Sequence, residues 1–126
     1  MPRGSTSRPD PRRALGVNGE RAVAAWYEAA GYEVLDRNWR NRTGELDLVV
    51  ARERVVVFCE VKTRRTNTFG APIEAITREK RQRLRVLAAQ WLDAHRDAVR
   101  EVRFDVASVF VRPGVDPVVE ILEGAF

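Results

Sequence analysis

The sequence predicts a single α/β domain in which helices flank a mixed β-sheet. Three observations lead to this fold class. Apolar residues recur at helical spacing in two segments. Runs rich in β-branched residues, bounded by turn signals, indicate several strands between and after those helices. The chain has 126 residues, which is enough for one sizeable core but not for two.

Composition separates a tail from the folded part. Residues 1–15 are rich in Pro, Gly, Ser and Arg, so we expect a disordered basic tail before one domain at residues 16–126. Cys59 is the single cysteine, which excludes an intrachain disulfide and fits a reducing, cytoplasmic environment. With His95 as the single histidine, the usual structural zinc site is excluded as well. No apolar run approaches the roughly 20 residues that span a bilayer, so no membrane partner is expected.

Two amphipathic helices frame the predicted strands. The first is expected from Gly19 to Ala30, where Gly31 stops it. The second is expected from Thr77 to about Ala98, with Thr77 as its N-cap. The first three strands suit an antiparallel meander, and the second helix then crosses back to place the next strand. The strands are expected at Tyr32–Asn38, Glu45–Ala51, Val55–Lys62 and Glu101–Val111, with a short final strand at Val118–Leu122.

Two acidic residues lie in phase on neighbouring strands. Asp47 and Glu60 belong to strands that the short polar connection 52–54 joins as a hairpin. Paired strands lie about 4.8 Å apart, so both carboxylates are able to face one side of the sheet and share a metal ion. Lys62 follows Glu60 by two residues and therefore emerges on the same face.

This residue set suits metal-assisted phosphodiester cleavage. Carboxylates hold a hard divalent cation such as Mg²⁺, or Mn²⁺, through oxygen. The cation polarises the phosphate and activates water, while Lys62 orients that water or stabilises the transition state. The backbone carbonyl of Val61 is a candidate further ligand. Glu20 lies at the margin of the first helix's buried face and is a candidate additional carboxylate.

The Glu-Xaa-Lys spacing by itself does not single out a nuclease. The alternative is a salt-bridged Glu60–Lys62 pair where the strand leaves the core. Two observations favour the catalytic interpretation. Glu60 follows an apolar run, in which an unpaired carboxylate would be costly. Asp47 also occupies the matching phase of the preceding strand.

Positive charge is concentrated beside these carboxylates. The net charge is +4, and between Lys62 and Arg85 eight basic residues face two acidic ones. Such an excess is typical of a surface that binds a polyanion, and nucleic acid, DNA in particular, is the expected partner. Of 22 basic residues only Lys62 and Lys80 are lysines, which indicates positions where arginine does not serve. The candidate phosphate contacts are Arg64, Arg65, Arg78, Lys80, Arg81 and Arg85, although a solvated helix face explains each one singly.

Other polar and aromatic residues have simpler interpretations. Trp39 and Phe69 lie in basic, turn-rich segments, where they either stack on bases or anchor the segment in the core. Arg103 and Asp105 share one face of their strand and are expected to form an internal salt bridge. His95 is expected to have no catalytic role.

A series of short motifs runs from about Gly16 to Val111. In order they are Gly16-Xaa-Xaa-Gly19-Glu20, Asn38-Xaa-Arg40, Gly44-Glu45-Leu46-Asp47-Leu48, Phe58-Xaa-Glu60-Val61-Lys62-Thr63-Arg64, Phe69-Gly70-Xaa-Pro72, Thr77-Xaa-Xaa-Lys80 and Arg103-Phe104-Asp105-Val106. With this order and spacing the chain resembles the YraN family of uncharacterised bacterial proteins. That family in turn resembles the restriction-endonuclease-like PD-(D/E)xK superfamily, and archaeal Holliday junction resolvases in particular.

The resemblance implies a restriction-endonuclease-like core in the order α-β-β-β-α-β and a metal-dependent nuclease site. It places Asp47, Glu60 and Lys62 at the superfamily's catalytic positions and Glu20 at the helical carboxylate of the resolvases. Leu46 stands where the superfamily's name has Pro. The similarity to resolvases also suggests a homodimer.

The sequence is therefore compatible with three functions. The first is a metal-dependent endonuclease acting on DNA, with branched or damaged DNA as candidate substrates, in repair, recombination or DNA processing. The alternative is a non-catalytic nucleic-acid-binding or adaptor protein that keeps the nuclease fold. The third is a structural domain whose Glu60–Lys62 pair is a salt bridge and whose other charges lie on the surface.

Overall fold

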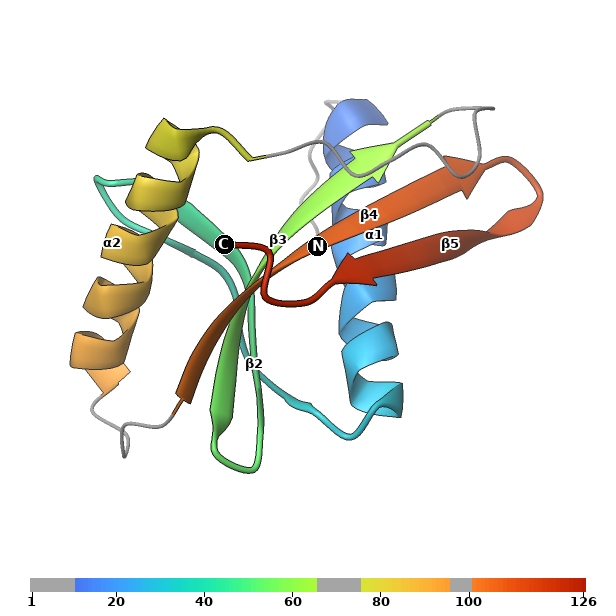
Figure 1. Ribbon diagram of the computed structural model, residues 1–126. Helices are drawn as coiled ribbons and strands as arrows, with labels where there is room; N and C mark the ends of the chain where they lie inside the picture. Colours follow the sequence, from blue (N-terminus) through green and yellow to red (C-terminus); the bar gives the residue numbers. More distant parts are fainter. Residues whose placement is uncertain (1–10, 66–75, 96–100) are drawn as a thin grey trace, which may run out of the picture.

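The computed structural model describes residues 11–65, 76–95 and 101–126, in which a five-stranded mixed sheet carries a helix on each face (Figure 1). This arrangement confirms the predicted α/β class. None of the helices in these ranges is long and apolar enough to cross a membrane. The elements, in chain order, are α1 (Pro11–Ala29), β1 (Glu33–Arg40), β2 (Glu45–Arg52), β3 (Val55–Arg64), α2 (Arg78–His95), β4 (Glu101–Arg112) and β5 (Val115–Leu122).

The sheet follows the predicted connections. Its strand order is β1-β2-β3-β4-β5, with β1, β2 and β3 forming an antiparallel meander. β4 then pairs in parallel with β3, so α2 serves as the crossover, and β5 returns antiparallel on the outer edge. The N-cap of α2 is also confirmed, because the backbone N–H of Lys80 donates to the Thr77 hydroxyl over 3.1 Å.

Most element boundaries lie within two residues of the predictions, and the two larger differences are at the starts of α1 and β5. α1 begins at Pro11 rather than Gly19, so it includes residues 11–15, which composition assigned to the tail; residues 1–10 lie outside the described residues. Proline is tolerated in the first turn of a helix, where its missing N–H would be unpaired anyway. β5 begins at Val115 rather than Val118 and includes Pro117. An edge strand tolerates proline because a residue on its outer side has no ladder partner for a backbone N–H.

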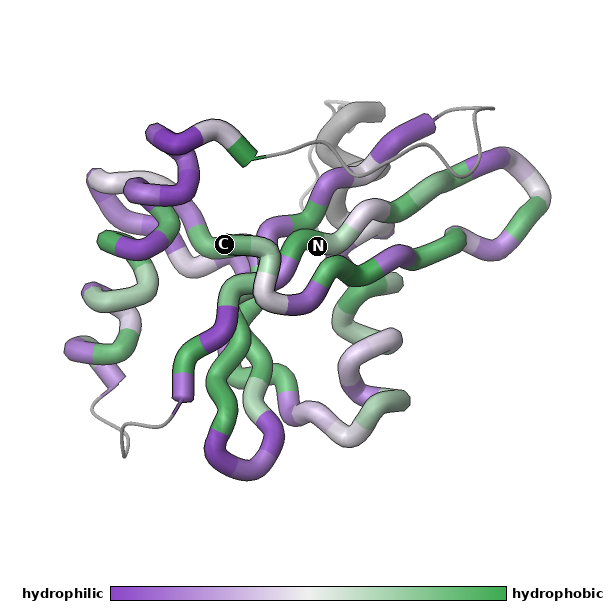
Figure 2. Tube along the Cα trace, in the orientation of Figure 1, coloured by the Kyte–Doolittle hydropathy of each residue, from purple (hydrophilic) through white to green (hydrophobic). Residues whose placement is uncertain are grey.

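Each face of the sheet has its own apolar core. β3 alternates, so Val57 and Cys59 pack with α1 while Val56 and Phe58 pack with α2. Beneath α1 the core is centred on Tyr27, and beneath α2 it is centred on Trp91, both almost fully buried. Figure 2 shows hydrophobic residues along the central strands and hydrophilic ones at the β2–β3 turn. The two cores hold the ends of the central strands in a fixed position.

A buried polar network ties α1 to β4. The Asp105 carboxylate is 0% exposed and accepts the Tyr27 hydroxyl over 2.6 Å. Arg103 donates through Nε and Nη2 to both carboxylate oxygens, each over 2.9 Å, which confirms the predicted ion pair. The Gly124 backbone N–H adds a bond of 3.1 Å. Four donated hydrogen bonds therefore satisfy this buried charge.

Removing the carboxylate from this network should destabilise the fold. We expect Asp105→Ala to lower the free energy of unfolding by about 3–5 kcal/mol, because it leaves the Arg103 guanidinium without its buried partner. Chemical denaturation measures this loss. The matched control is Asp116→Ala on the exposed part of β5, which we expect to change stability by less than about 0.5 kcal/mol. Equal stability of the two variants would contradict the assigned role.

Candidate functional site

The predicted carboxylates meet where β2 and β3 separate. The ladder between these strands runs from Arg52–Val55 to Leu48–Cys59, and the next residues along are Asp47 and Glu60. There the backbone N–H of Val61 donates to Asp47 Oδ2 over 2.9 Å. A side-chain carboxylate thus satisfies a backbone donor at the point where the ladder between the two strands has ended.

Lys80 reaches the carboxylates from α2, which packs on one face of the sheet. Its Nζ lies 2.7 Å from Glu60 Oε2, and the Glu60 side chain is only 9% exposed. Lys80 belongs to the first turn of α2, whose start Thr77 holds by capping. From sequence, Lys80 was expected only among the phosphate contacts, so its pairing with Glu60 was missed. The scarcity of lysine and the inward phase of position 80 were the available signals.

Glu20 approaches from α1. The preceding residue, Gly19, packs so closely on β3 that a Cβ there would collide with the Thr63 hydroxyl. Glycine therefore lets the helix come near the end of the strand, which is where Glu20 interacts with the other carboxylates. Asn38 hydrogen-bonds the Glu20 side chain from a left-handed backbone conformation with φ 52°. Asparagine tolerates that conformation. An asparagine inside a predicted strand was the signal that could have identified Asn38 as a site residue.

Burial and crowded negative charge together determine the electrostatics of the site. Burial, followed by repulsion from the Glu60 carboxylate, raises the pKa of Asp47 to about 7. The Val61 N–H opposes this rise, while Glu20 and Glu45 add to it. Burial also raises the pKa of Glu20, against the hydrogen bond from Asn38. A bound cation would relieve this repulsion between the carboxylates.

The donors present fit a magnesium-type ion better than a soft metal. Asp47 and Glu60 offer carboxylate oxygens from adjacent strands, and Val61 between them adds a backbone carbonyl. Within the described ranges no three Asp, Glu, His or Cys side chains gather as a ready-made metal-binding group. Mg²⁺ is commonly held by one or two carboxylates together with water and substrate phosphate, so two are sufficient. Lys62, half-buried, follows Glu60 on the same face of β3.

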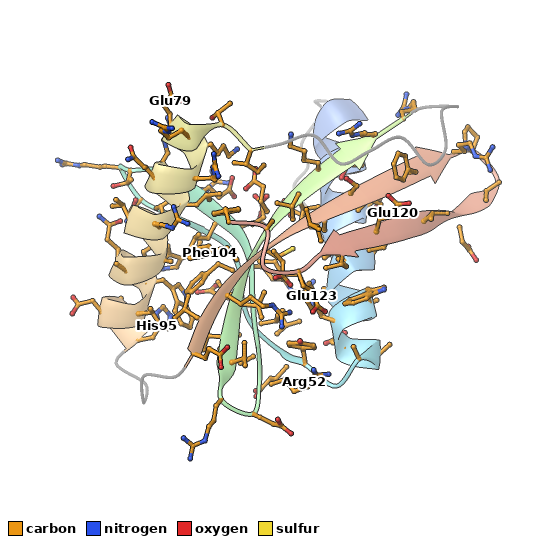
Figure 3. The ribbon with its side chains drawn as sticks, in the orientation of Figure 1. Arg52, Glu79, His95, Phe104, Glu120 and Glu123 are labelled. Carbon is orange, nitrogen blue, oxygen red and sulfur yellow. The ribbon has the colours of Figure 1, made fainter. Side chains whose placement is uncertain are left out.

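The predicted phosphate contacts are distributed unequally around this site. Arg65 and Arg78 are exposed just after β3 and at the start of α2, and Arg64 ends β3. Arg81 is half-buried, and its Nε–H has no hydrogen-bond partner among the described residues. Arg85 lies over two aromatic rings of the α2 core instead, 5.8 Å and 5.6 Å from the centroids of Phe104 and Phe126; Figure 3 labels Phe104.

Two further predictions concern aromatic residues. Trp39 is half-buried, packs against the α2 core and meets His95 edge-on at 6.5 Å, which supports the anchoring interpretation. Phe69 lies outside the described residues. His95 stacks on Trp91 at 3.9 Å and lies 3.6 Å from Asp36, so it belongs to the contact between α2 and β1.

Comparisons with known proteins identify one family. The profile described as "Uncharacterised protein family UPF0102" matches residues 19–109. A "UPF0102 protein" of Nocardia farcinica is 46% identical over 115 residues, 91% of each chain. One from Beutenbergia cavernae is 54% identical over 96 residues, 76% of this chain and 81% of its own. A third, from Frankia casuarinae, is 52% identical over 114 residues, 90% of this chain and 96% of its own.

The raised pKa of Asp47 predicts that neutralising this side chain stabilises the metal-free protein. A carboxyl group with a raised pKa in the folded state binds its proton more tightly there, so the fold loses stability as the pH rises from about 4 through about 7. Asp47→Asn keeps an oxygen for the Val61 N–H and should melt several degrees higher than the wild type at pH 8 in EDTA; roughly 4 °C corresponds to 1 kcal/mol. The difference in melting temperature between the two proteins should narrow toward pH 4. A difference in melting temperature that is absent, or that is the same at both pH values, would contradict the raised pKa of Asp47.

The contact between α1 and β3 predicts an inverted glycine effect. Inside a helix, Gly→Ala usually stabilises by about 1 kcal/mol. Gly19→Ala should instead destabilise by about 1–3 kcal/mol, because the new methyl group meets the Thr63 side chain. Urea denaturation measures the effect. Thr63→Ala in the same chain removes the nearest atom and should restore part of the loss, whereas a double variant no more stable than Gly19→Ala would count against the contact.

Proposed function

We propose that this chain, which belongs to the UPF0102 family of YraN-like bacterial proteins, is a metal-dependent endonuclease that acts on DNA. One observation carries the proposal. Asp47 and Glu60 lie next to each other where β2 and β3 separate, and a positively charged side chain, Lys80, already lies against Glu60. Buried like charges are costly for stability, so their retention supports a role beyond folding.

The divalent cation, Mg²⁺ or Mn²⁺, would be held by Asp47, Glu60 and the carbonyl of Val61, with Glu20 as an additional carboxylate. Bound there, it supplies Lewis-acid polarisation of a phosphate and a more acidic water. The chain's own groups do the remaining work. Lys62 orients the attacking water or offsets the negative charge that develops on the phosphate. The hydrogen bond from the Val61 N–H holds the Asp47 carboxylate in place.

The surrounding basic residues support DNA as the substrate. Arg65 and Arg78 are exposed beside the site, where their guanidinium groups are open to a phosphate. Such groups bind phosphates irrespective of sequence. The α-β-β-β-α-β order is also that of the restriction-endonuclease-like core, and the motifs resemble those of Holliday junction resolvases. Branched or damaged DNA, met in repair or recombination, is therefore the substrate we favour, with a homodimer as the form that cuts both strands.

A second candidate function is nucleic-acid binding without cleavage. The absence of a three-ligand cluster among the described side chains favours it. Such an adaptor would use the arginines alone, and its affinity would fall with salt but would not depend on a divalent cation.

A cleavage assay with matched variants separates these functions. The wild type, with Mg²⁺ or Mn²⁺, should cut at least one of linear, flapped or four-way DNA. Asp47→Ala and Lys62→Ala should each lose roughly 100-fold or more in rate, because they remove a metal ligand and a group that stabilises the transition state. Gel resolution of labelled DNA measures the rates.

The control for this assay is binding of the same DNA, followed by fluorescence anisotropy in Ca²⁺. Exposed Asp116→Ala should cut and bind as the wild type does. Equal DNA binding by all variants, with no cleavage under either metal, would refute the endonuclease and favour the adaptor.

A further inference from the structure

Both lysines of the chain are associated with the carboxylate site. Lys62 follows Glu60 by two residues on β3, and Lys80 contacts Glu60 from α2. The sequence holds 22 basic residues, and all of them except these two lysines are arginines. Arginine presents a planar fork of donors, whereas lysine presents one compact charge on a flexible stem. The chain therefore places its only compact cations at this one site.

A second buried carboxylate in the neighbouring strand shows what a permanent partner looks like here. Asp105 is held by the two-point fork of Arg103, by the Tyr27 hydroxyl and by the Gly124 N–H. That arrangement leaves the carboxylate no freedom. Bidentate arginine pairs of this kind add both energy and geometric specificity.

Glu60 has a much weaker hold. Its side chain is 9% exposed, yet within the described ranges its carboxylate has a single ion pair, to Lys80 Nζ over 2.7 Å. The Lys80 side chain is itself 43% exposed, so its head reaches the carboxylate from the solvent side. A cation held by one contact and open to water is able to leave at small cost.

We infer that Lys80 is a displaceable counter-ion of Glu60, which holds this carboxylate ready for a divalent cation and yields to it when it binds. The inference rests on the proposed metal site. Without a metal, Lys80 offsets part of the negative charge that Asp47 and Glu60 share. Once the metal is bound, the same ammonium group is free on the basic surface of α2, where it becomes a contact for DNA phosphate.

This exchange has a measurable consequence for metal affinity. The divalent cation must displace a positive charge before it binds, so its affinity is set by a competition with Lys80. Removing that charge should tighten metal binding, and a lysine-to-arginine change, which offers a firmer fork, should weaken it. A lysine that merely stabilised the fold would affect stability but would not produce opposite changes in metal affinity.

The first test uses the unmodified protein. Acetic anhydride labels free amines, and because only Lys62 and Lys80 carry side-chain amines, mass spectrometry reports each one cleanly. We expect Mg²⁺ to raise the labelling of Lys80 several-fold, because its head group is no longer engaged by Glu60. NaCl at the same ionic strength is the control and should not do so. Labelling of Lys80 that Mg²⁺ leaves unchanged would overturn the inference.

The second test measures Mn²⁺ affinity by calorimetry without DNA. Lys80→Met should bind Mn²⁺ roughly five- to tenfold more tightly than the wild type, since a unit charge beside the ligand has been removed. Lys80→Arg should bind it more weakly. Arg83→Met is the matched control, because it removes an exposed charge one turn along the same helix and should change the affinity by less than twofold.

These outcomes separate the inference from the proposed function. Tighter Mn²⁺ binding by Lys80→Met in a protein that cuts no DNA would uphold the counter-ion and refute the endonuclease. An affinity that matches that of Arg83→Met, or no Mn²⁺ binding by any of the proteins, would overturn the counter-ion. If Lys80→Met does not fold, the Mn²⁺ affinity of Lys80→Arg and the labelling of Lys80 in the wild type test the counter-ion instead.

Discussion

The hydrogen bond from the Val61 N–H to the Asp47 carboxylate is the contact on which the site depends. In a continuous hairpin the strands would go on pairing, and backbone carbonyls would accept the donors of β3. Here the ladder ends at Leu48 and Cys59, and an acidic side chain accepts instead. Beside it, Glu60 lies on the α2 face of β3 and pairs with Lys80, while Glu20 of α1 is close enough to raise the pKa of Asp47.

Local pattern explains why much of this was predictable. The β-branched run at Val55 to Lys62 predicted β3 and the phase of Glu60, and the short polar turn predicted that Asp47 would lie opposite. Contacts between layers were not predictable in this way. The Lys80–Glu60 pair depends on where the crossover sets α2 down, and the Gly19–Thr63 approach depends on the distance between α1 and the sheet. Neither distance is encoded in the periodicity of one segment.

Burial of charge has opposite outcomes in two parts of the sheet. On β4 the chain surrounds Asp105 with donors until the carboxylate is fully satisfied, which links α1 to the C-terminal segment. On β2 and β3 it leaves Asp47 and Glu60 side by side, where burial and then their mutual repulsion raise the pKa of Asp47 to about 7. A chain able to build the first arrangement is not forced into the second. Local conflict of this sort is concentrated where a protein trades stability for function.

The same contrast ranks the remaining functions. A purely structural domain gains nothing from buried carboxylates that repel each other, and an adaptor needs the arginines around α2 but not the acids beneath them. A negative centre beside a basic surface is contradictory for a protein that only binds a polyanion, because the acids would repel its phosphates. A divalent cation removes the contradiction, since it is attracted by the acids and in turn attracts phosphate. The metal-dependent endonuclease that we propose is thus the function in which both the acids and the basic residues of the site contribute.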